Sequence, residues 1–388
     1  MRHTTCVHIA PGLDSRLGGI TSSLFGLCQG TEAAGGYRNE IVAFCGRDEA
    51  DASPTAGATR FPAGRLLWYT SRALRTRLRK RLEPAGIIHI HGVWTEHCSI
   101  TGRLARQSGT PYLVSAHGML ESWALRQKRY KKAWYSNFVE RPNLQSAACL
   151  RALTLQEVAD YRAFGLRNPI VLIPNPAPVR PQADASIFFA RRPELAGKRI
   201  VLFMSRIHTK KGLDILCRAW AAIHRDFPDA HLVIAGPDSD GTLERTVSLA
   251  RTLRIESSVT FTGMLAGVDK WSALSAANVF ILPSYSEGFS MAILEALSAG
   301  CPVIATRACN FPDIAGHHCG WLIDPDPVQI QAALIGALHC SDESRRERGL
   351  AGQALVARQY TPDRIGRQFT EVYDWLLGGP RPASVQIF

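Results

Sequence analysis

Short apolar runs alternate with longer amphipathic segments along the whole chain. In the first half, the apolar runs predict strands at residues 6–10, 40–44, 87–91, 112–116, 149–153 and 170–173. Segments with helical periodicity lie between most of these runs and include residues 21–33, 66–82 and 99–107. This alternation is typical of parallel sheets connected by crossover helices.

A second alternating series begins at Arg199, after prolines crowd into residues 174–181 and predict a linker. Its strands are predicted at residues 200–205, 231–235, 259–262, 279–282, 303–305 and 320–323, and its helices at 212–225, 241–253, 270–276, 290–299 and 329–340. One more helix is predicted at 362–377, before a polar tail. Two doubly wound halves would hold a ligand in a cleft at the carboxyl ends of their strands.

Length and composition fit this organisation. The 388 residues are 46% hydrophobic and 20% charged, which is enough apolar material for two globular cores. No apolar run is long enough to span a membrane, and the first residues resemble a strand more than a signal peptide. The ten cysteines form no C-x-x-C pair, which favours buried, reduced thiols in a cytoplasmic protein. The formal net charge of +12 favours anionic partners.

The strongest chemical signal is the segment SYSEGFSMAILEALSAG. It places Glu287 in a polar turn after a strand, and Glu295 inside a helix whose N-cap is Ser290. The backbone N–H groups of Phe289, Ser290 and Met291 would then bind a phosphate or a sugar hydroxyl. One glutamate could hold sugar hydroxyls and the other a ribose. The alternative is a surface turn before an ordinary helix, but Glu295 stands among apolar residues, which disfavours it.

A second signal is the segment SRIHTKKGLD, which follows the first strand of the second half. Its Arg206 and Lys211 could stabilise the negative charge that develops on a departing nucleoside diphosphate. A solvated basic loop is an equally good interpretation of this segment taken alone.

Weaker signals lie in the first half. Gly18 and Gly19 follow the first strand, where glycine permits close approach to a phosphate, but the loop lacks the G-x-G-x-x-G fingerprint. His117 ends a strand, where an imidazole could bind a sugar hydroxyl or shuttle a proton, although a lone histidine is more often structural. His89 and His91 fit the structural interpretation better. No cluster has the ligand spacing of a metal site, so no metal is expected.

Four elements follow one another along the chain: the glycine loop at Gly18 and Gly19, the strand end at His117, the segment SRIHTKKGLD and the segment SYSEGFSMAILEALSAG. In this order they resemble the E-x7-E retaining glycosyltransferases of the large GT-B family. The resemblance covers nearly the whole chain, and the block EGFSMAILEALSAGCPVIAT is its specific part. It implies a GT-B fold, in which two Rossmann-like domains at 1–178 and 179–360 face a central cleft and a helix at 361–378 crosses back to the first domain. It implies no metal, because the cations and helix ends do the work of one, and no other cofactor, because the nucleotide-sugar is itself a substrate.

The resemblance also implies roles for the site residues. Glu287 and His117 are expected to contact the donor sugar, and Glu295 the ribose. Arg206, Lys211 and Gly19 are expected to contact the diphosphate. The remaining donor-binding residues are expected to be Gly18, Gly288, Phe289, Ser290 and Met291.

Two basic stretches, 65–81 and 126–132, raise the question of a membrane surface. The first carries leucines at helical spacing beside a row of arginines. A helix packed on its own sheet and a helix resting on anionic lipid explain it equally well. The second could bind a phosphate of the acceptor. We therefore expect a cytoplasmic protein that binds peripherally to the inner face of the cell membrane.

The sequence thus predicts transfer of a hexose, with retention, from a UDP- or GDP-sugar to a glycan or lipid-linked acceptor. The stretch SAHGMLESWALRQKRYKKAWY resembles a subgroup that builds cell-surface polysaccharides. Two alternatives remain open: a sugar-nucleotide epimerase of the same architecture, and a basic nucleic-acid-binding protein. No zinc module, helix-turn-helix or aromatic-rich RNA motif favours nucleic acid as a partner.

Overall fold

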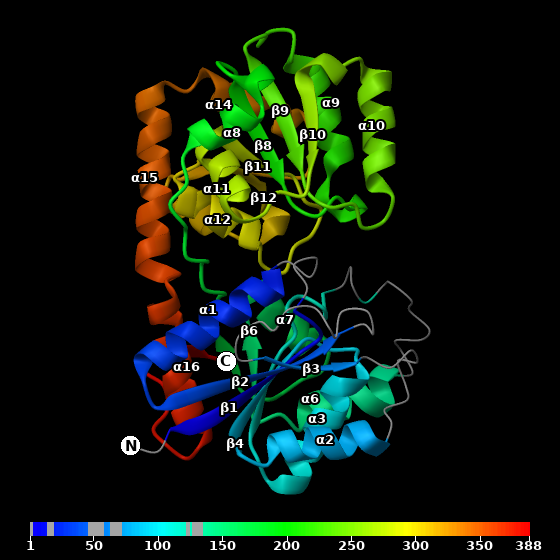
Figure 1. Cartoon of the computed structure of the whole chain (residues 1–388), viewed down its shortest axis with the longest axis vertical. Coiled ribbons are helices and arrows are strands. Elements are labelled where there is room, and N and C mark those ends of the chain that lie inside the picture. Colours follow the sequence, from blue (N-terminus) through cyan, green and yellow to red (C-terminus); the bar gives the residue numbers. More distant parts are fainter. Residues whose placement is uncertain (1–2, 14–18, 46–57, 63–71, 122–124, 126–134) are drawn as a thin grey trace. The chain divides into compact units, whose positions relative to one another are not determined.

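The computed structural model divides the chain into two compact units: Met1–Pro176 with Thr361–Phe388 (unit 1), and Ala177–Tyr360 (unit 2). The structure describes all residues except 1–2, 14–18, 46–57, 63–71, 122–124 and 126–134. Each unit is a layered α/β structure around a sheet of parallel strands (Figure 1). The predicted fold class, two Rossmann-like halves, is confirmed.

In the described part of unit 1, eight strands form one sheet in the order β14-β7-β6-β5-β4-β1-β2-β3. Neighbouring strands pair in parallel, except that β14 runs antiparallel to β7. The strands are β1 (Thr4–Ala10), β2 (Tyr37–Cys45), β3 (Ala58–Pro62), β4 (Ala85–His91), β5 (Tyr112–Ser115), β6 (Cys149–Ala152), β7 (Ile170–Leu172) and β14 (Gln386–Ile387). The helices are α1 (Gly19–Ala34), α2 (Arg72–Leu82), α3 (Glu96–Ser108), α6 (Arg141–Gln145), α7 (Leu155–Ala163) and α16 (Pro362–Leu376).

In unit 2, six parallel strands follow the order β10-β9-β8-β11-β12-β13. They are β8 (Arg199–Met204), β9 (Ala230–Ala235), β10 (Val259–Gly263), β11 (Ala277–Leu282), β12 (Val303–Thr306) and β13 (Gly320–Ile323). The helices are α8 (Ala185–Arg191), α9 (Leu213–Ile223), α10 (Thr242–Leu253), α11 (Gly267–Ala276), α12 (Met291–Ala299), α13 (Asp313–Gly316), α14 (Pro327–His339) and α15 (Asp342–Gln359).

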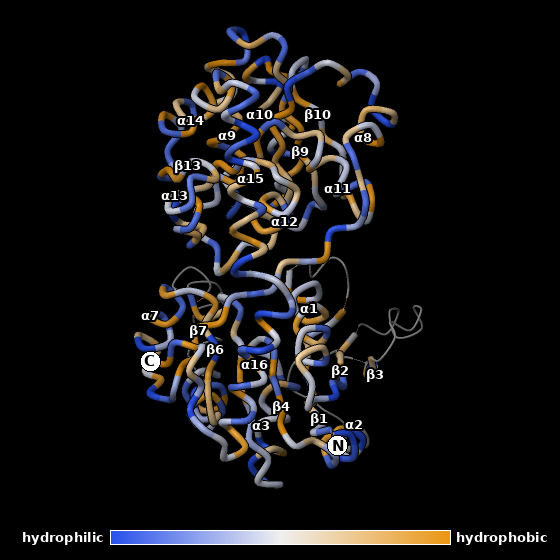
Figure 2. Tube along the Cα trace, turned by 90° about the vertical axis from the view of Figure 1, so that its left-hand side faces the viewer, coloured by the Kyte–Doolittle hydropathy of each residue, from blue (hydrophilic) through white to orange (hydrophobic). Residues whose placement is uncertain are grey.

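Each sheet is covered on both faces by apolar side chains. In β1, Val7 and Ile9 pack into one hydrophobic cluster, whereas Cys6 packs into another that includes Leu27 of α1 and Phe369 of α16. Alternate residues of a strand therefore face different helices, as the two-residue period of a strand requires. Hydrophobic colouring in Figure 2 follows strands inside the second sheet such as β9.

The last long helix, α16, belongs to unit 1 and lies beside α1 (Figure 1). The two backbones touch at Gly30 and Gly366: a Cβ on Gly30 would lie 2.0 Å from the carbonyl oxygen of Pro362. Only glycine permits this approach. The Tyr37 hydroxyl also donates to Asp374 of α16 at 2.7 Å. These contacts hold the chain's return from unit 2 against the first sheet.

Two elements differ from the sequence prediction. The tail predicted as merely polar contains β14, which forms only because β7 offers it a free edge. The helix α15 lies where none was predicted, because Gly349, Gly352, Leu355 and Val356 are buried while most of its other residues are polar or charged. Residues 66–71 of the predicted basic helix lie outside the described residues. No helix in the described part of the chain has the length and apolar character needed to cross a membrane.

Candidate functional site

Two adjacent strands of unit 2 bring predicted site residues together. Because β8 and β11 pair in parallel, their carboxyl ends lie at the same edge of the sheet. Arg206 follows β8, and Glu287 lies in the turn after β11. The two loops meet at Gly212, which has φ 69°, and a Cβ there would lie 2.0 Å from the carbonyl oxygen of Pro283. This glycine is therefore required for the close approach of the loops.

Glu287 and Lys211 form a buried ion pair, with side chains 11% and 9% exposed. The Ser284 hydroxyl donates to the same carboxylate oxygen at 2.8 Å. Burial alone would raise the pKa of Glu287, but the Lys211 ammonium and these hydrogen bonds outweigh burial and lower the pKa. The carboxylate is therefore ionised at neutral pH. An ammonium has three donors, so Lys211 can bind a phosphate oxygen while it holds Glu287.

The turn after Glu287 leads into the N-terminus of α12. Ser290 is the N-cap, and its hydroxyl accepts a hydrogen bond from the Ile293 N–H at 3.4 Å. The Asn310 side chain donates to the Glu287 carbonyl oxygen at 2.7 Å and fixes the turn. First-turn N–H groups have no acceptor within their helix, so they favour an anion. The predicted donor-binding residues that share this turn and helix start are Gly288, Phe289, Ser290 and Met291.

Glu295 lies in the middle of α12 and is 8% exposed. Lys270 of α11 donates to its carboxylate at 2.6 Å. The low exposure of Glu295 confirms the burial that its apolar neighbours predicted. A buried carboxylate needs a partner such as Lys270. Sequence reasoning missed Lys270 as the partner of this predicted site residue, because no local pattern links an isolated lysine to a glutamate 25 positions later.

The candidates of the first half lie in unit 1. Gly18 lies outside the described residues, and Gly19 is the first residue of α1. His117 follows β5 with φ 53°, a conformation that is uncommon for residues other than glycine. The next N–H, of Gly118, donates to the buried carboxylate of Glu157 at 2.7 Å and holds the turn. A strained residue at a strand end, held by its surroundings, is typical of functional sites.

Comparison with known families assigns both units. The model of the glycosyl transferase 4-like domain matches residues 18–176, and the model of the glycosyl transferases group 1 matches residues 186–354. The chain belongs to the glycosyltransferase group 1 family. Members of this family transfer sugars from nucleotide-sugars. Arg206, Lys211 and Glu287 all lie within residues 186–354, the part of the chain that the group 1 model matches.

Curated relatives support this assignment. Alpha-maltose-1-phosphate synthase of Mycolicibacterium smegmatis is 27% identical over 75% of this chain and 79% of its own length. The D-inositol 3-phosphate glycosyltransferase of Salinispora tropica is 31% identical, but the match covers 50% of this chain and 42% of that enzyme. The phosphatidyl-myo-inositol mannosyltransferase of Mycobacterium tuberculosis is 30% identical over 49% of this chain and 50% of its own length.

Solved structures share the fold of this glycosyltransferase. Sucrose-phosphate synthase from Thermosynechococcus elongatus has a TM-score of 0.75 at 23% identity, over 96% of this chain and 99% of its own. Anabaena HepE, solved with UDP and glucose, has a TM-score of 0.74 at 16% identity, over 96% of this chain and 100% of its own. At such identities the likeness establishes the GT-B fold alone.

Replacing Glu295 of this glycosyltransferase should act on donor affinity. We expect E295Q to raise the KM for the donor by about tenfold, the effect of one lost charged hydrogen bond, with kcat little changed. The reason is that the ribose contact predicted for Glu295 would persist through the reaction. Steady-state kinetics at varied donor concentration would measure both constants. E347Q, an exposed change on α15, is the matched control, and identical kinetics for the two variants would contradict the ribose assignment.

A histidine cluster in unit 1 has the composition of a metal site. Ring nitrogens of His8, His89 and His91 lie within 4.8 Å of one another, although no metal was expected from the sequence. Each ring nitrogen of the three is already within hydrogen-bond distance of a protein group. A metal would have to displace several of these bonds, so the cluster is better described as a buried hydrogen-bond network.

Proposed function

We propose that the chain is a retaining hexosyltransferase that uses a UDP- or GDP-sugar and acts in cell-surface polysaccharide biosynthesis. The observation that carries the proposal is the ionised Glu287, held by Lys211 beside the start of α12. This arrangement combines a carboxylate for sugar hydroxyls with donors for a diphosphate.

The proposed reaction uses the residues as follows. Arg206, Lys211 and the N-terminus of α12 stabilise the negative charge on the departing nucleoside diphosphate. Glu287 and His117 hold the hydroxyls of the donor sugar. The acceptor hydroxyl then attacks the anomeric carbon from the side of the leaving group, and its proton passes to a phosphate oxygen. This geometry keeps the configuration of the anomeric carbon.

The relatives support parts of this proposal. Anabaena HepE has been solved with UDP-glucose, which supports a nucleotide-linked hexose as donor. The names of two curated relatives specify inositol-containing acceptors, one of them a phosphatidyl lipid. The second of these names supports an acceptor that is carried on a lipid.

A donor screen followed by product analysis tests the proposal. Nucleotide-sugars that bind the folded protein should raise its melting temperature. The donor that stabilises most is then incubated with and without saccharide acceptors, and NMR coupling constants give the anomeric configuration of the product. Retention supports the proposal, whereas an inverted product contradicts it. A change of the sugar without acceptor would instead indicate an epimerase.

Transfer should survive strong chelation. Arg206, Lys211 and the α12 N-terminus supply the positive potential that a metal provides in other sugar transferases. We expect the same initial rate after dialysis against EDTA, measured with and without added magnesium or manganese. A complete loss of activity that one divalent metal restores would contradict this prediction.

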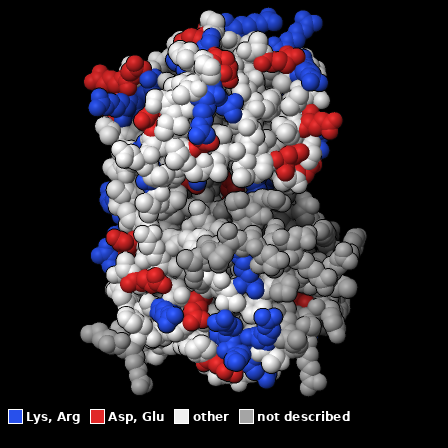
Figure 3. Space-filling model, in the orientation of Figure 1, with Lys and Arg blue, Asp and Glu red and all other residues white. Residues whose placement is uncertain are grey.

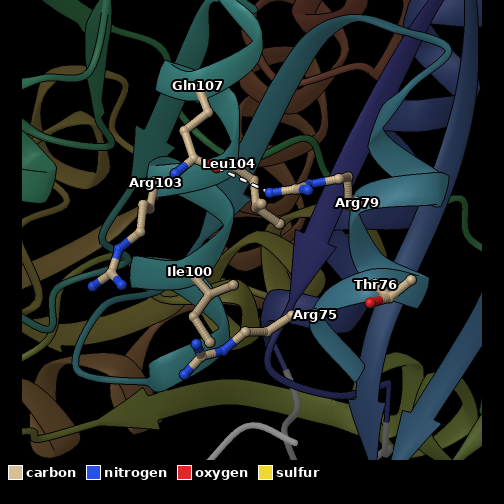
Figure 4. Close-up of a pocket in the computed structure, with 7 residues that line it drawn as sticks. All are labelled: Arg75, Thr76, Arg79, Ile100, Arg103, Leu104 and Gln107. Atoms are coloured by element: carbon tan, nitrogen blue, oxygen red, sulfur yellow. Dashed lines mark hydrogen bonds between the residues drawn. The ribbon is translucent and has the colours of Figure 1, made fainter. Parts of the chain in front are cut away.

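We further propose that unit 1 binds an anionic surface through α2. Leu78 and Leu82 of α2 are buried in unit 1, which leaves its basic face outward. Lys and Arg side chains gather on the surface over α2 and α3 (Figure 3). Between these helices lies a pocket of about 310 Å³ with three arginines (Figure 4), lined by Arg75, Thr76, Arg79, Ile100, Arg103, Leu104 and Gln107. The other basic stretch, 126–132, lies outside the described residues.

Removing charge from α2 should release the protein from anionic vesicles. Each surface cation near an anionic leaflet contributes about 1 kcal/mol, so three removals should weaken the partition by roughly two orders of magnitude. Co-sedimentation at low and high salt measures it for the triple variant R75Q, R79Q and K80Q. The charge-matched control changes three exposed arginines of unit 2: Arg225, Arg251 and Arg254. Equal pelleting of both variants, or no pelleting of the wild type, would contradict the proposal.

A further inference from the structure

One face of the sheet in unit 1 carries a buried row of polar side chains. Asn39 of β2, His8 of β1 and His91 of β4 lie on the face that α1 and α16 cover, and His117 follows β5. His8 and His91 are 0% and 1% exposed. Such groups need hydrogen-bond partners inside the protein. These four residues supply them to one another.

The contacts form one continuous chain. Asn39 Oδ1 lies 2.9 Å from His8 Nε2. His8 Nδ1 lies 3.1 Å from His91 Nε2, and His91 Nδ1 lies 3.1 Å from His117 Nε2. The chain therefore runs from β2, across β1 and β4, to the residue that follows β5.

Asn39 fixes the direction of this chain. Its Nδ2 donates to the Cys28 carbonyl oxygen at 3.0 Å and to the Thr31 hydroxyl at 2.9 Å. A carbonyl oxygen can only accept, so turning the amide over would place two acceptors against each other. The Asn39 oxygen must therefore face His8, and His8 Nε2 must carry the proton. The Cys6 sulfur, 3.4 Å from the same nitrogen, is a weaker second contact.

The donor-to-acceptor direction is passed from ring to ring along these hydrogen bonds, because a neutral imidazole has one donor and one acceptor. Since His8 donates from Nε2, its Nδ1 accepts from His91 Nε2. His91 Nδ1 is then an acceptor, and it receives the proton of His117 Nε2. Each ring is held in the same tautomer. One ring nitrogen remains, Nδ1 of His117, and none of the residues that the structure describes bonds to it. The His117 side chain is partly exposed.

The surroundings keep all three rings neutral. Burial lowers the pKa of His8 to about 4 and that of His117 to about 3. Burial also lowers the pKa of His91 well below its usual value, and the neighbouring histidines and Arg151 lower it further. Arg151 is itself fully buried in β6, where it donates to the Ile173 carbonyl oxygen at 2.9 Å. A fixed positive charge beside the chain disfavours any second proton on it.

We propose that Asn39, His8 and His91 are positioning residues that fix His117 as the Nε2–H tautomer and leave its Nδ1 as a permanent hydrogen-bond acceptor. This inference rests on the proposed contact between His117 and the donor sugar. His117 then accepts a hydrogen bond from a sugar hydroxyl and cannot bind a phosphate oxygen, which is also an acceptor. Replacing that hydroxyl by fluorine, which cannot donate, should lower donor affinity as much as removing it.

Nitrogen NMR of protein labelled with ¹⁵N-histidine reads the tautomer directly, without donor or activity. The His117 signals are assigned by their absence from H117N. The wild type should show His117 as neutral with the proton on Nε2 at pH 7. A proton on Nδ1, a charged ring, or signals of histidines bound to a metal ion would each overturn the proposal.

Two phenylalanine variants in the same strand distinguish an effect of the hydrogen-bond chain from a general effect of packing. His89 is as buried as His91, but it bonds to the Tyr373 hydroxyl at 2.9 Å and to Ser115 at 2.7 Å, outside the chain. H91F should give a mixture of His117 tautomers and lower kcat by about tenfold, the effect of one lost hydrogen bond in the reaction. H89F should keep the Nε2–H tautomer. Equal tautomer changes in both variants would overturn the proposal.

Asn39 offers a second test at a less buried position. N39L removes the acceptor that sets the direction, whereas N39D keeps an acceptor oxygen against His8. The tautomer of His117 should become mixed in N39L and stay fixed in N39D, and the opposite result would overturn the proposal. If the tautomer is fixed but H117N transfers sugar normally, the proposed sugar contact of His117 is wrong, while the hydrogen-bond chain is supported. If H117N is impaired but His117 carries its proton on Nδ1, only the proposed hydrogen-bond chain is wrong.

Discussion

E287Q should lower kcat/KM for sugar transfer by about 10²–10³ and also destabilise unit 2. The carboxylate is the predicted ligand of the sugar hydroxyls, and it is the partner of the buried Lys211. Removing one member of a buried ion pair leaves the other charge uncompensated, which costs about 3–5 kcal/mol of unfolding free energy. Steady-state kinetics and urea unfolding of the two proteins measure both effects.

A double variant separates these two losses. In K211M/E287Q the unpaired ammonium is gone, so the unfolding free energy should recover toward that of the wild type. Activity should not recover, because both the sugar ligand and a phosphate donor are missing. A double variant that regains transfer would show that the single variant failed through instability, and the site assignment would be wrong.

The same pair predicts a pH dependence of stability. The folded-state pKa of Glu287 is lowered, because the attraction of Lys211 outweighs burial. Its stabilising contribution is therefore complete above the usual glutamate pKa of 4.5 and is lost as the pH falls through the lowered value. The difference in unfolding free energy between wild type and E287Q should be largest at neutral pH and shrink in acid. A difference that is constant from pH 7 to pH 3 would contradict the ion pair.

R206Q should lower kcat by about 10²–10³ with almost no change in stability. Arg206 is exposed after β8, and substitutions of exposed side chains usually change the unfolding free energy by less than about 0.5 kcal/mol. Its expected task arises only as the diphosphate departs, so kcat and kcat/KM should fall together. Single-turnover rates with saturating donor measure the chemical step.

Two controls accompany this variant. R251Q removes an equal charge from the exposed side of α10 and should leave kcat unchanged. R206K keeps the charge but loses the planar, bidentate geometry, so its rate should fall between those of the wild type and R206Q. Equal losses in R206Q and R251Q would mean that the effect is a general one of surface charge.

Local patterns in the sequence predicted most of the fold and much of the candidate site. The strand β11, the turn with Glu287 and the Ser290 cap of α12 are consecutive, so one segment of sequence carried all three. Each depends on short-range signals: an apolar run, a polar turn and a hydroxyl at the helix start. The family followed from the same block.

Other features depend on neighbours that are far away in the chain. Lys270 meets Glu295 because α11 and α12 pack side by side, and no local pattern connects the two residues. β14 exists because β7 leaves an edge to be paired. His91, interpreted as structural from the sequence, joins His8 and His117 because three strands bring them within hydrogen-bond distance.

The sequence by itself therefore determined the alternating α/β organisation, the family and the residues at the strand ends, since periodicity and capping act over a few residues. The tertiary structure alone decided which partners those residues have. Lys211 neutralises Glu287, and Asn39 sets the hydrogen-bond direction that reaches His117, across separations of tens of residues. Parallel strands place side chains distant in sequence on one face, and only their packing fixes charge state and tautomer.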